Sequence, residues 1–197
     1  MNELWFRPFV WLDYRLAVVV MLIAPLILLI WTLAQQSEAM HRLLLIYWRV
    51  ASLWLITLYL MIPGWPLAYF TAFAARILIP LSLWFWVDLN DEIKDLPPSL
   101  LRLATTSWRW AATLYCCFGA LFLIPFLSCG FGTSAGNANF CQVWFLAPWS
   151  FKAWFHNQAT PGFLGFLGIV GLIIYVLYFL YFLVFRLGRQ GRSALEQ

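Results

Sequence analysis

Charged residues are scarce in this sequence of 197 residues: Asp, Glu, Lys and Arg make up 10% of it, whereas 64% is hydrophobic. A soluble domain of this size could not bury so many apolar side chains, so the sequence predicts an integral membrane protein. The net charge is +4, and the basic residues form no dense run. We therefore expect membrane lipids as partners and no nucleic acid.

Familiar catalytic and metal-binding motifs are also missing. The sequence has no GxSxG, HExxH, CxxC or phosphate-binding glycine loop. Its two histidines, His41 and His156, fall on opposite sides of the predicted topology and cannot bind one haem together. Asp91, Glu92 and Asp95 could bind a cation weakly, although a solvated acidic loop is the more ordinary interpretation. We expect no enzyme, no catalytic residue and no metal site.

Aromatic residues make up 20% of the sequence and include 13 Trp. Trp and Tyr concentrate in belts at membrane interfaces, which is the commonest reason for such a composition. The same rings could contact chlorophyll, carotenoid or lipid. Apart from such contacts, we expect no cofactor.

Five apolar runs are long enough to cross about 30 Å of hydrocarbon at about 1.5 Å per residue. They cover residues 16–34, 43–62, 67–87, 108–127 and 162–185. The expected fold is an all-α bundle of about five transmembrane helices in a single domain, residues 1–197. Residues 1–15 are expected to lie in the interface, and residues 128–161 to form an interfacial loop on the outer side. A cleaved signal peptide is the rival interpretation of the first run.

The positive charges predict the orientation of the five spans. If the C-terminus is cytoplasmic, Arg42, Lys94, Arg102, Arg186, Arg189 and Arg192 lie inside, and Arg7, Arg15 and Lys152 lie outside. Cytoplasmic loops carry the excess of Lys and Arg, so six against three favours a cytoplasmic C-terminus and an external N-terminus.

Cys129 and Cys141 flank a small, polar segment on the predicted outer side. The outer side is oxidising, so a disulfide could form and persist there, and it would stabilise the fold by about 3 kcal/mol in the chain-entropy model. Two free thiols are the alternative.

Four ionisable residues lie within or beside the predicted spans, and such residues are usually paired in helical bundles. We predict a structural ion pair between Asp88 and Arg49, Arg109 or both. A proton or ion relay and unpaired, snorkelling side chains are the alternatives. Arg76 is deeper, and no acidic residue lies within any predicted span. Its expected contact is therefore a partner protein or a lipid, with backbone carbonyls near a proline as a further candidate.

Gly162, Gly165, Gly168 and Gly171 recur every three residues in the last span. Small residues allow helix backbones to approach closely, so this strip predicts helix packing. Packing within the chain is favoured over packing with a partner.

The sequence resembles an uncharacterised family of small integral membrane proteins of cyanobacteria. The resemblance covers most of the chain through the stretches IYWRVASLWLITLYLM, ARILIPLSLWFWVDLNDEI, IPFLSC, PGFLGFLGIVGLIIYVLY and RLGRQGRSA. It implies a photosynthetic bacterium and the thylakoid membrane, with the plasma membrane as the alternative. It transfers no catalytic or binding residue.

These observations favour a non-enzymatic accessory, assembly or structural subunit of a larger membrane complex, which the resemblance associates with photosynthesis. A small transporter or channel lined by Arg76 and Asp88 is the alternative. The sequence supports it less, because it has no repeated half and no acidic residue at the predicted midplane. An enzyme acting on a lipid or quinone would lack a catalytic constellation.

Overall fold

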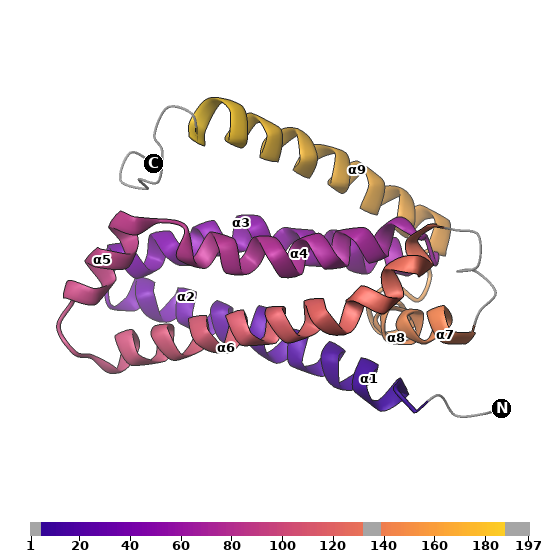
Figure 1. Ribbon diagram of the computed structural model, residues 1–197, viewed down its shortest axis with the longest axis horizontal. Coiled ribbons are helices and arrows are strands. Elements are labelled where there is room, and N and C mark those ends of the chain that lie inside the picture. The colour runs from indigo at the N-terminus through magenta and orange to yellow at the C-terminus, as the bar shows by residue number, and fades with distance from the viewer. Residues whose placement is uncertain (1–4, 132–138, 188–197) are drawn as a thin grey trace.

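The computed structural model describes residues 5–131 and 139–187, and within these ranges the chain is helical and has no strand (Figure 1). Five helices are long and apolar enough to cross a membrane. They are Arg7–Ala34, Glu38–Met61, Leu67–Trp84, Leu100–Phe131 and Pro161–Phe185. The predicted fold class is confirmed: the chain is an all-α, multi-pass integral membrane protein.

The first membrane helix consists of α1 (Arg7–Leu16), a π-helical segment (Ala17–Ile23) and α2 (Ala24–Ala34). Next come α3 (Glu38–Met61), α4 (Leu67–Trp84), the short α5 (Val87–Asp95), and α6 (Leu100–Leu123) with its 3-10 extension (Ile124–Phe131). The remaining elements are α7 (Asn139–Gln142), a 3-10 turn (Val143–Phe145), α8 (Leu146–Phe155), α9 (Pro161–Tyr181) and a terminal π-helical segment (Phe182–Leu187).

Three membrane helices begin at least five residues earlier than predicted. The first begins at Arg7, not at residue 16, because the aromatic and charged residues before the apolar run continue the same helix. The second begins at Glu38, not at residue 43, and the fourth begins at Leu100, not at residue 108. The cap of the fourth is Ser99, whose hydroxyl accepts a hydrogen bond from the backbone N–H of Arg102 at 3.2 Å. Polar residues thus extend all three helices beyond their apolar runs.

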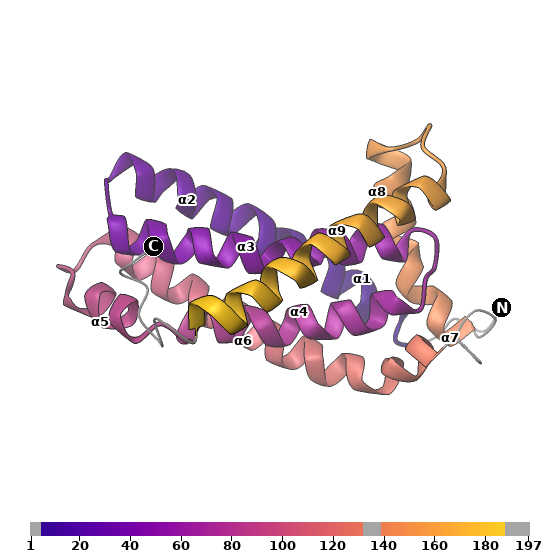
Figure 2. The same ribbon diagram turned by 90° about the horizontal axis from the view of Figure 1, so that it is seen from above.

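A tight turn makes α3 and α4 antiparallel neighbours. Gly64 has a φ of +76°, a conformation that glycine adopts at little cost, and Pro63 and Pro66 flank it. The backbone N–H groups of Gly64 and Trp65 bond to carbonyls at the end of α3. The two helices lie side by side over their length (Figures 1 and 2).

The π-helical segment of the first helix has free carbonyls that side chains from α3 and α6 occupy. Pro25 has no N–H to donate to the carbonyl of Met21, four residues earlier. The Tyr47 hydroxyl donates to that carbonyl at 2.5 Å, and the Trp108 indole donates to the carbonyl of Val20 at 2.8 Å. The irregular segment therefore attaches the first helix to its neighbours.

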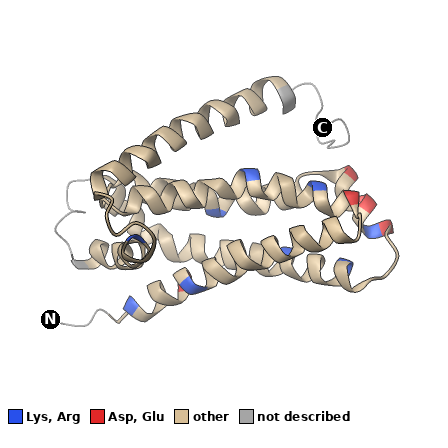
Figure 3. Cartoon of the chain, turned by 180° about the vertical axis from the view of Figure 1, so that it is seen from behind, with Lys and Arg blue, Asp and Glu red and all other residues tan. Residues whose placement is uncertain are grey.

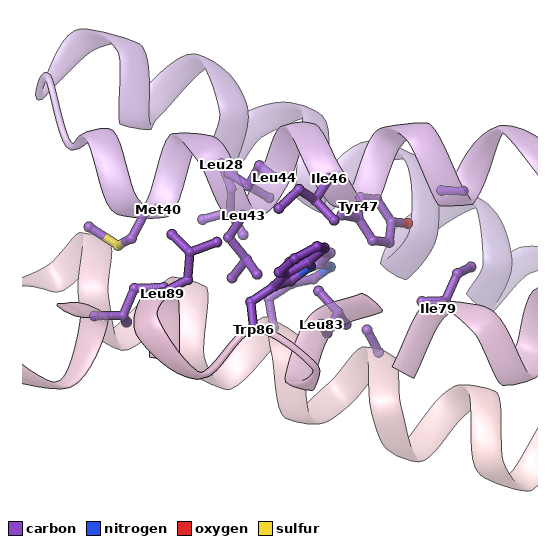
Figure 4. Packing of buried hydrophobic residues seen from close by; sticks show 14 of the residues in the cluster. Leu28, Met40, Leu43, Leu44, Ile46, Tyr47, Ile79, Leu83, Trp86 and Leu89 are labelled. Carbon is purple, nitrogen blue, oxygen red and sulfur yellow. The ribbon is translucent and has the colours of Figure 1, made fainter. Parts of the chain in front are cut away.

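The buried core has two apolar clusters. One lies toward α5, where Leu43 of α3 packs with Leu83 of α4 and with Trp86, the residue before α5 (Figure 4). The other lies toward α7 and α8 and includes Phe126 and Trp144, whose ring centroids are 5.2 Å apart. Between the clusters, the interior of the bundle contains charged groups.

The last helix, α9, is peripheral. In its most apolar 18-residue window 6% of the residues are buried, against 50% for the corresponding window of α4. It crosses α3 and α4 obliquely and leans away from them toward its C-terminal end (Figures 1 and 2). Its amino-terminal half is therefore attached more closely than its carboxyl-terminal half.

Candidate functional site

Arg76 and Asp13 form an ion pair inside the bundle. Arg76 lies in the middle of α4, about 13 Å along the helix from Leu67, and its side chain is 1% exposed. Its Nη2 is 2.6 Å from Oδ2 of Asp13 on α1, a side chain that is 14% exposed. A buried charge is costly unless it is paired, so this contact removes most of the penalty for placing Arg76 at that depth.

Two further helices complete the surroundings of the pair. The Tyr115 hydroxyl of α6 donates to Oδ1 of Asp13 at 2.8 Å, so both carboxylate oxygens accept a bond. From α3, the ring of Trp54 lies 4.6 Å from Cζ of Arg76, which is a cation–π distance. Gly119 of α6 leaves the space for Arg76: a Cβ there would lie 2.7 Å from Nε.

This pair corrects the expectation that the chain supplies no carboxylate for Arg76. The expectation was wrong because it placed Asp13 in an interfacial segment outside the first span. The helix instead begins at Arg7, which brings Asp13 into the bundle. The clue in the sequence was the lone acid between helix-compatible aromatic residues, just ahead of an apolar run.

Arg109 joins α6 to the break between α4 and α5. Its Nη2 donates to the carbonyl of Leu83 at 2.7 Å and to Oδ1 of Asn90, and its Cζ lies 4.1 Å from the centroid of the Trp84 ring. The amide of Asn90 in turn donates to the carbonyl of Trp84 at 3.1 Å. A cation at a helix C-terminus is favourable, because the last carbonyls lack partners within the helix.

Asp88 lies half-buried in the first turn of α5, where a carboxylate stabilises the start of a helix. Its predicted ion pair is not formed: among the described residues, neither Arg49 nor Arg109 makes an ion pair. Arg49 lies on an exposed face of α3, and the guanidinium of Arg109 bonds to Leu83 and Asn90. Most of the carboxylates gather at the α5 end of the bundle, whereas Lys and Arg are scattered along its length (Figure 3).

Three glycines of the predicted strip face α3 and the turn that follows it. A Cβ added to Gly165 would lie 2.6 Å from Pro63, one on Gly168 3.0 Å from Leu60, and one on Gly171 3.3 Å from Ile56. Gly162 differs, because nothing lies within 4 Å of the position of its Cβ. The strip therefore begins at Gly165, and its contacts are within the chain.

Cys129 and Cys141 form a disulfide, with 6.0 Å between their Cα atoms. The Tyr69 hydroxyl of α4 donates to the carbonyl of Cys141 at 2.7 Å, and a Cβ on Gly130 would lie 2.5 Å from Phe70. Both ends of the bridged segment thus contact the amino-terminal end of α4. Cys116 is a buried free thiol, and Cys117 is an exposed one.

A groove of about 280 Å³ opens between α9 and the α3–α4 pair. We call it the side groove, and its walls are mostly apolar. The lining residues are Ile46, Arg49, Val50, Leu78, Leu81, Ser82, Phe85, Trp86, Tyr175, Tyr178, Phe179, Phe182 and Leu183. The sequence analysis identified Arg49, but the oblique crossing of α9 that brings it together with the aromatic residues of that helix is not visible in the sequence.

The match to a family model decides the relationship of the chain to other proteins. Residues 7–195 match the family described as Protein of unknown function (DUF3177). The chain belongs to this family. No curated protein and no solved structure matches it.

Two arrangements of side chains in this DUF3177 protein have properties that bear on its function. The Asp13–Arg76 pair joins α1, α4 and α6 and carries no net charge, so it suits mechanical coupling of helices. The side groove combines an apolar wall with a cation, which suits an amphiphile. Within residues 5–131 and 139–187, no three His, Cys, Asp or Glu side chains are grouped to hold a metal ion.

Proposed function

We propose that the protein is a non-catalytic accessory, assembly or structural subunit of a larger membrane protein complex. The observation that carries the proposal is α9, a full-length apolar helix that is almost unburied within its own chain. Helices associate in lipid through packing and not through a hydrophobic driving force, so the open face of such a helix is available to a neighbour.

The two faces of α9 differ in a way that supports this role. The inward face approaches α3 through small residues, of which Gly168 has the closest backbone contact. The outward face carries large side chains, including Phe166 at 58% exposure, Ile174 at 62% and Leu177 at 63%. Large apolar and aromatic side chains supply most of the contact area in helix interfaces.

The internal charges support a structural role for the rest of the chain. Arg76 is bonded to Asp13, and Arg109 is bonded to Leu83 and Asn90, so neither needs a partner protein. The surface that remains for docking is therefore apolar. We expect the complex to be held by shape complementarity along α9, with little dependence on salt.

A photo-reactive amino acid at position 177 tests the docking face. Leu121 of α6 is a matched control, because it is also leucine and also 63% exposed. In native membranes we expect protein adducts of discrete mass from position 177 and only lipid adducts from position 121. Lipid adducts alone from both positions, or protein adducts from position 121 alone, would count against docking through α9.

The membrane and the complex are inferred from the resemblance described above. It supports the thylakoid membrane of a photosynthetic bacterium and a photosynthetic complex, and the positive charges support a cytoplasmic C-terminus. Fractionation of thylakoid and plasma membranes, followed by native gel electrophoresis, tests both statements. Migration of the chain alone, as a monomer or homodimer, would contradict the subunit role.

The alternative role is a small transporter or channel, and the buried Asp13–Arg76 pair favours it. Ionisable residues inside membrane helices often mark ion or proton paths. Proteoliposomes that contain the protein and a pH-sensitive dye would detect proton movement. Flux that disappears in Asp13→Asn and persists in Glu38→Gln would support transport over the subunit role.

A further inference from the structure

We propose that the side groove binds one chain of an anionic lipid, whose negatively charged head group pairs with Arg49. This site is independent of the docking role of α9. It rests on the shape of the groove, on its single charge and on unpaired hydrogen-bond donors at its edge.

The charge of the groove selects an anion. Arg49 is the only charged residue among those that line it. Within the described part of the chain, the guanidinium of Arg49 has no hydrogen bond, ion pair or ring contact. A cation beside an apolar wall is costly without a counter-charge, and basic pockets between membrane helices characteristically hold acidic lipid head groups.

Two other polar side chains that line the groove favour the same ligand. The hydroxyls of Tyr175 and Tyr178 lie on the α9 wall and have no hydrogen-bond partner among the described residues. A phosphate or sulfonate head group has several acceptor oxygens and can use such donors together with a guanidinium.

The groove lies toward the α5 end of the bundle. Arg49 is near the middle of α3, and the side chain of a helical residue leans toward the N-terminus of its helix, which for α3 is the α5 end. The wall from α4 includes Ser82 and Phe85, and Phe85 directly follows the last residue of that helix. The wall from α9 comes from the second half of the helix, where α9 leans away from the bundle (Figure 1). A lipid in the leaflet at the α5 end could place its head group at Arg49 and one chain along Phe179.

The size of the groove suits a slender ligand. Its volume of about 280 Å³ is just below the range of small-ligand pockets, which is about 300–1,000 Å³. A single flexible chain therefore suits the groove better than a bulky ring system.

Native mass spectrometry of the purified full chain tests this site. The probes are phosphatidylglycerol and phosphatidylcholine with identical acyl chains. We expect phosphatidylglycerol to bind about fivefold more tightly, since one cation near the membrane surface is worth about that factor. Equal affinity for the two lipids would overturn the proposal.

Four variants distinguish the contribution of the positive charge to lipid binding from the contribution of the apolar groove. Arg49→Gln should abolish the preference for phosphatidylglycerol, and Arg49→Lys should retain most of it. Ser82→Leu narrows the groove and should weaken the binding of both lipids. Arg15→Gln, the control, removes an exposed arginine outside the groove and should change nothing. A preference that survives in a folded Arg49→Gln variant, verified by thermal unfolding, would overturn the proposal.

Glycerol phosphate, a head group without chains, distinguishes a lipid site from a free-phosphate site. We expect no displacement of phosphatidylglycerol by millimolar glycerol phosphate, because the apolar wall contributes most of the binding. Displacement at that concentration would show that the head group alone occupies the site, and the lipid proposal would be wrong.

Discussion

Asp13 and Arg76 are 63 residues apart in the chain, and their side chains meet at 2.6 Å within the bundle. Their contact joins α1 to α4, and the Tyr115 hydroxyl adds α6 to it. Because each charge lies where water is scarce, the two charges depend on each other. This dependence gives the first prediction.

Asp13→Asn leaves the charge of Arg76 buried and unpaired. We expect the free energy of unfolding to fall by about 3–5 kcal/mol, the usual cost of breaking a buried pair by removing one partner. Thermal or denaturant unfolding in detergent measures it. The control is Glu38→Gln, which breaks the exposed Arg42–Glu38 pair and should cost less than about 1 kcal/mol.

The double variant Asp13→Asn with Arg76→Gln completes the cycle for this pair. We expect its loss of stability to be well below the sum of the two single losses, because no buried charge remains. Strict additivity would mean that the pair does not couple the helices.

Gly119→Ala should destabilise the same site by steric conflict. The new methyl group would lie 2.7 Å from Nε of Arg76, whose side chain is fixed at its other end by Asp13. We expect a loss of about 1–3 kcal/mol, typical of overpacking. Gly162→Ala is the matched control, since its Cβ would meet nothing within 4 Å. Equal effects of the two changes on the unfolding temperature would contradict this interpretation.

Gly168→Leu should separate α9 from α3. A Cβ at this position already lies 3.2 Å from the backbone N of Leu60, so a larger side chain cannot be accommodated without moving the helix. Spin labels at positions 52 and 173 report the distance between the two helices, and we expect it to lengthen and broaden. The distance should stay unchanged in Gly162→Leu.

Cys129→Ser removes the disulfide. We expect a loss of about 3 kcal/mol in the chain-entropy model. The matched change Cys117→Ser affects an exposed free thiol and should cost little. Alkylation of the unfolded, non-reduced protein should add two groups, because two of the four cysteines are bonded to each other. Four added groups without reductant would show that no disulfide had formed.

The apolar runs predicted the number and type of the membrane helices, because length and composition alone decide which segments fit a bilayer. They did not predict where the helices begin. Asp13 lies on a helical extension that composition assigns to the interface, yet packing draws this residue into the bundle. A buried polar contact depends on tertiary structure, and hydropathy carries no information about it.

The glycine strip shows the same division on a smaller scale. Its period of three residues indicated a packing face, since small residues permit close approach. The period did not distinguish Gly162 from Gly165, because the difference between them is the position of Pro63 in the facing turn. The side groove was similarly beyond the sequence, as it depends on the angle at which α9 crosses α3.

The Asp13–Arg76 pair also has a consequence for the order of events during synthesis. At about 5–20 residues per second, Arg76 is made about 3–13 s after Asp13. Throughout that interval the carboxylate has no counter-charge, and an isolated acid in hydrocarbon is costly. We therefore expect α1 to lie first in the membrane interface and to enter the bundle only when α4 arrives. The amino-terminal part of the first helix would then enter the bundle after α3 and α4, although it is synthesised before them.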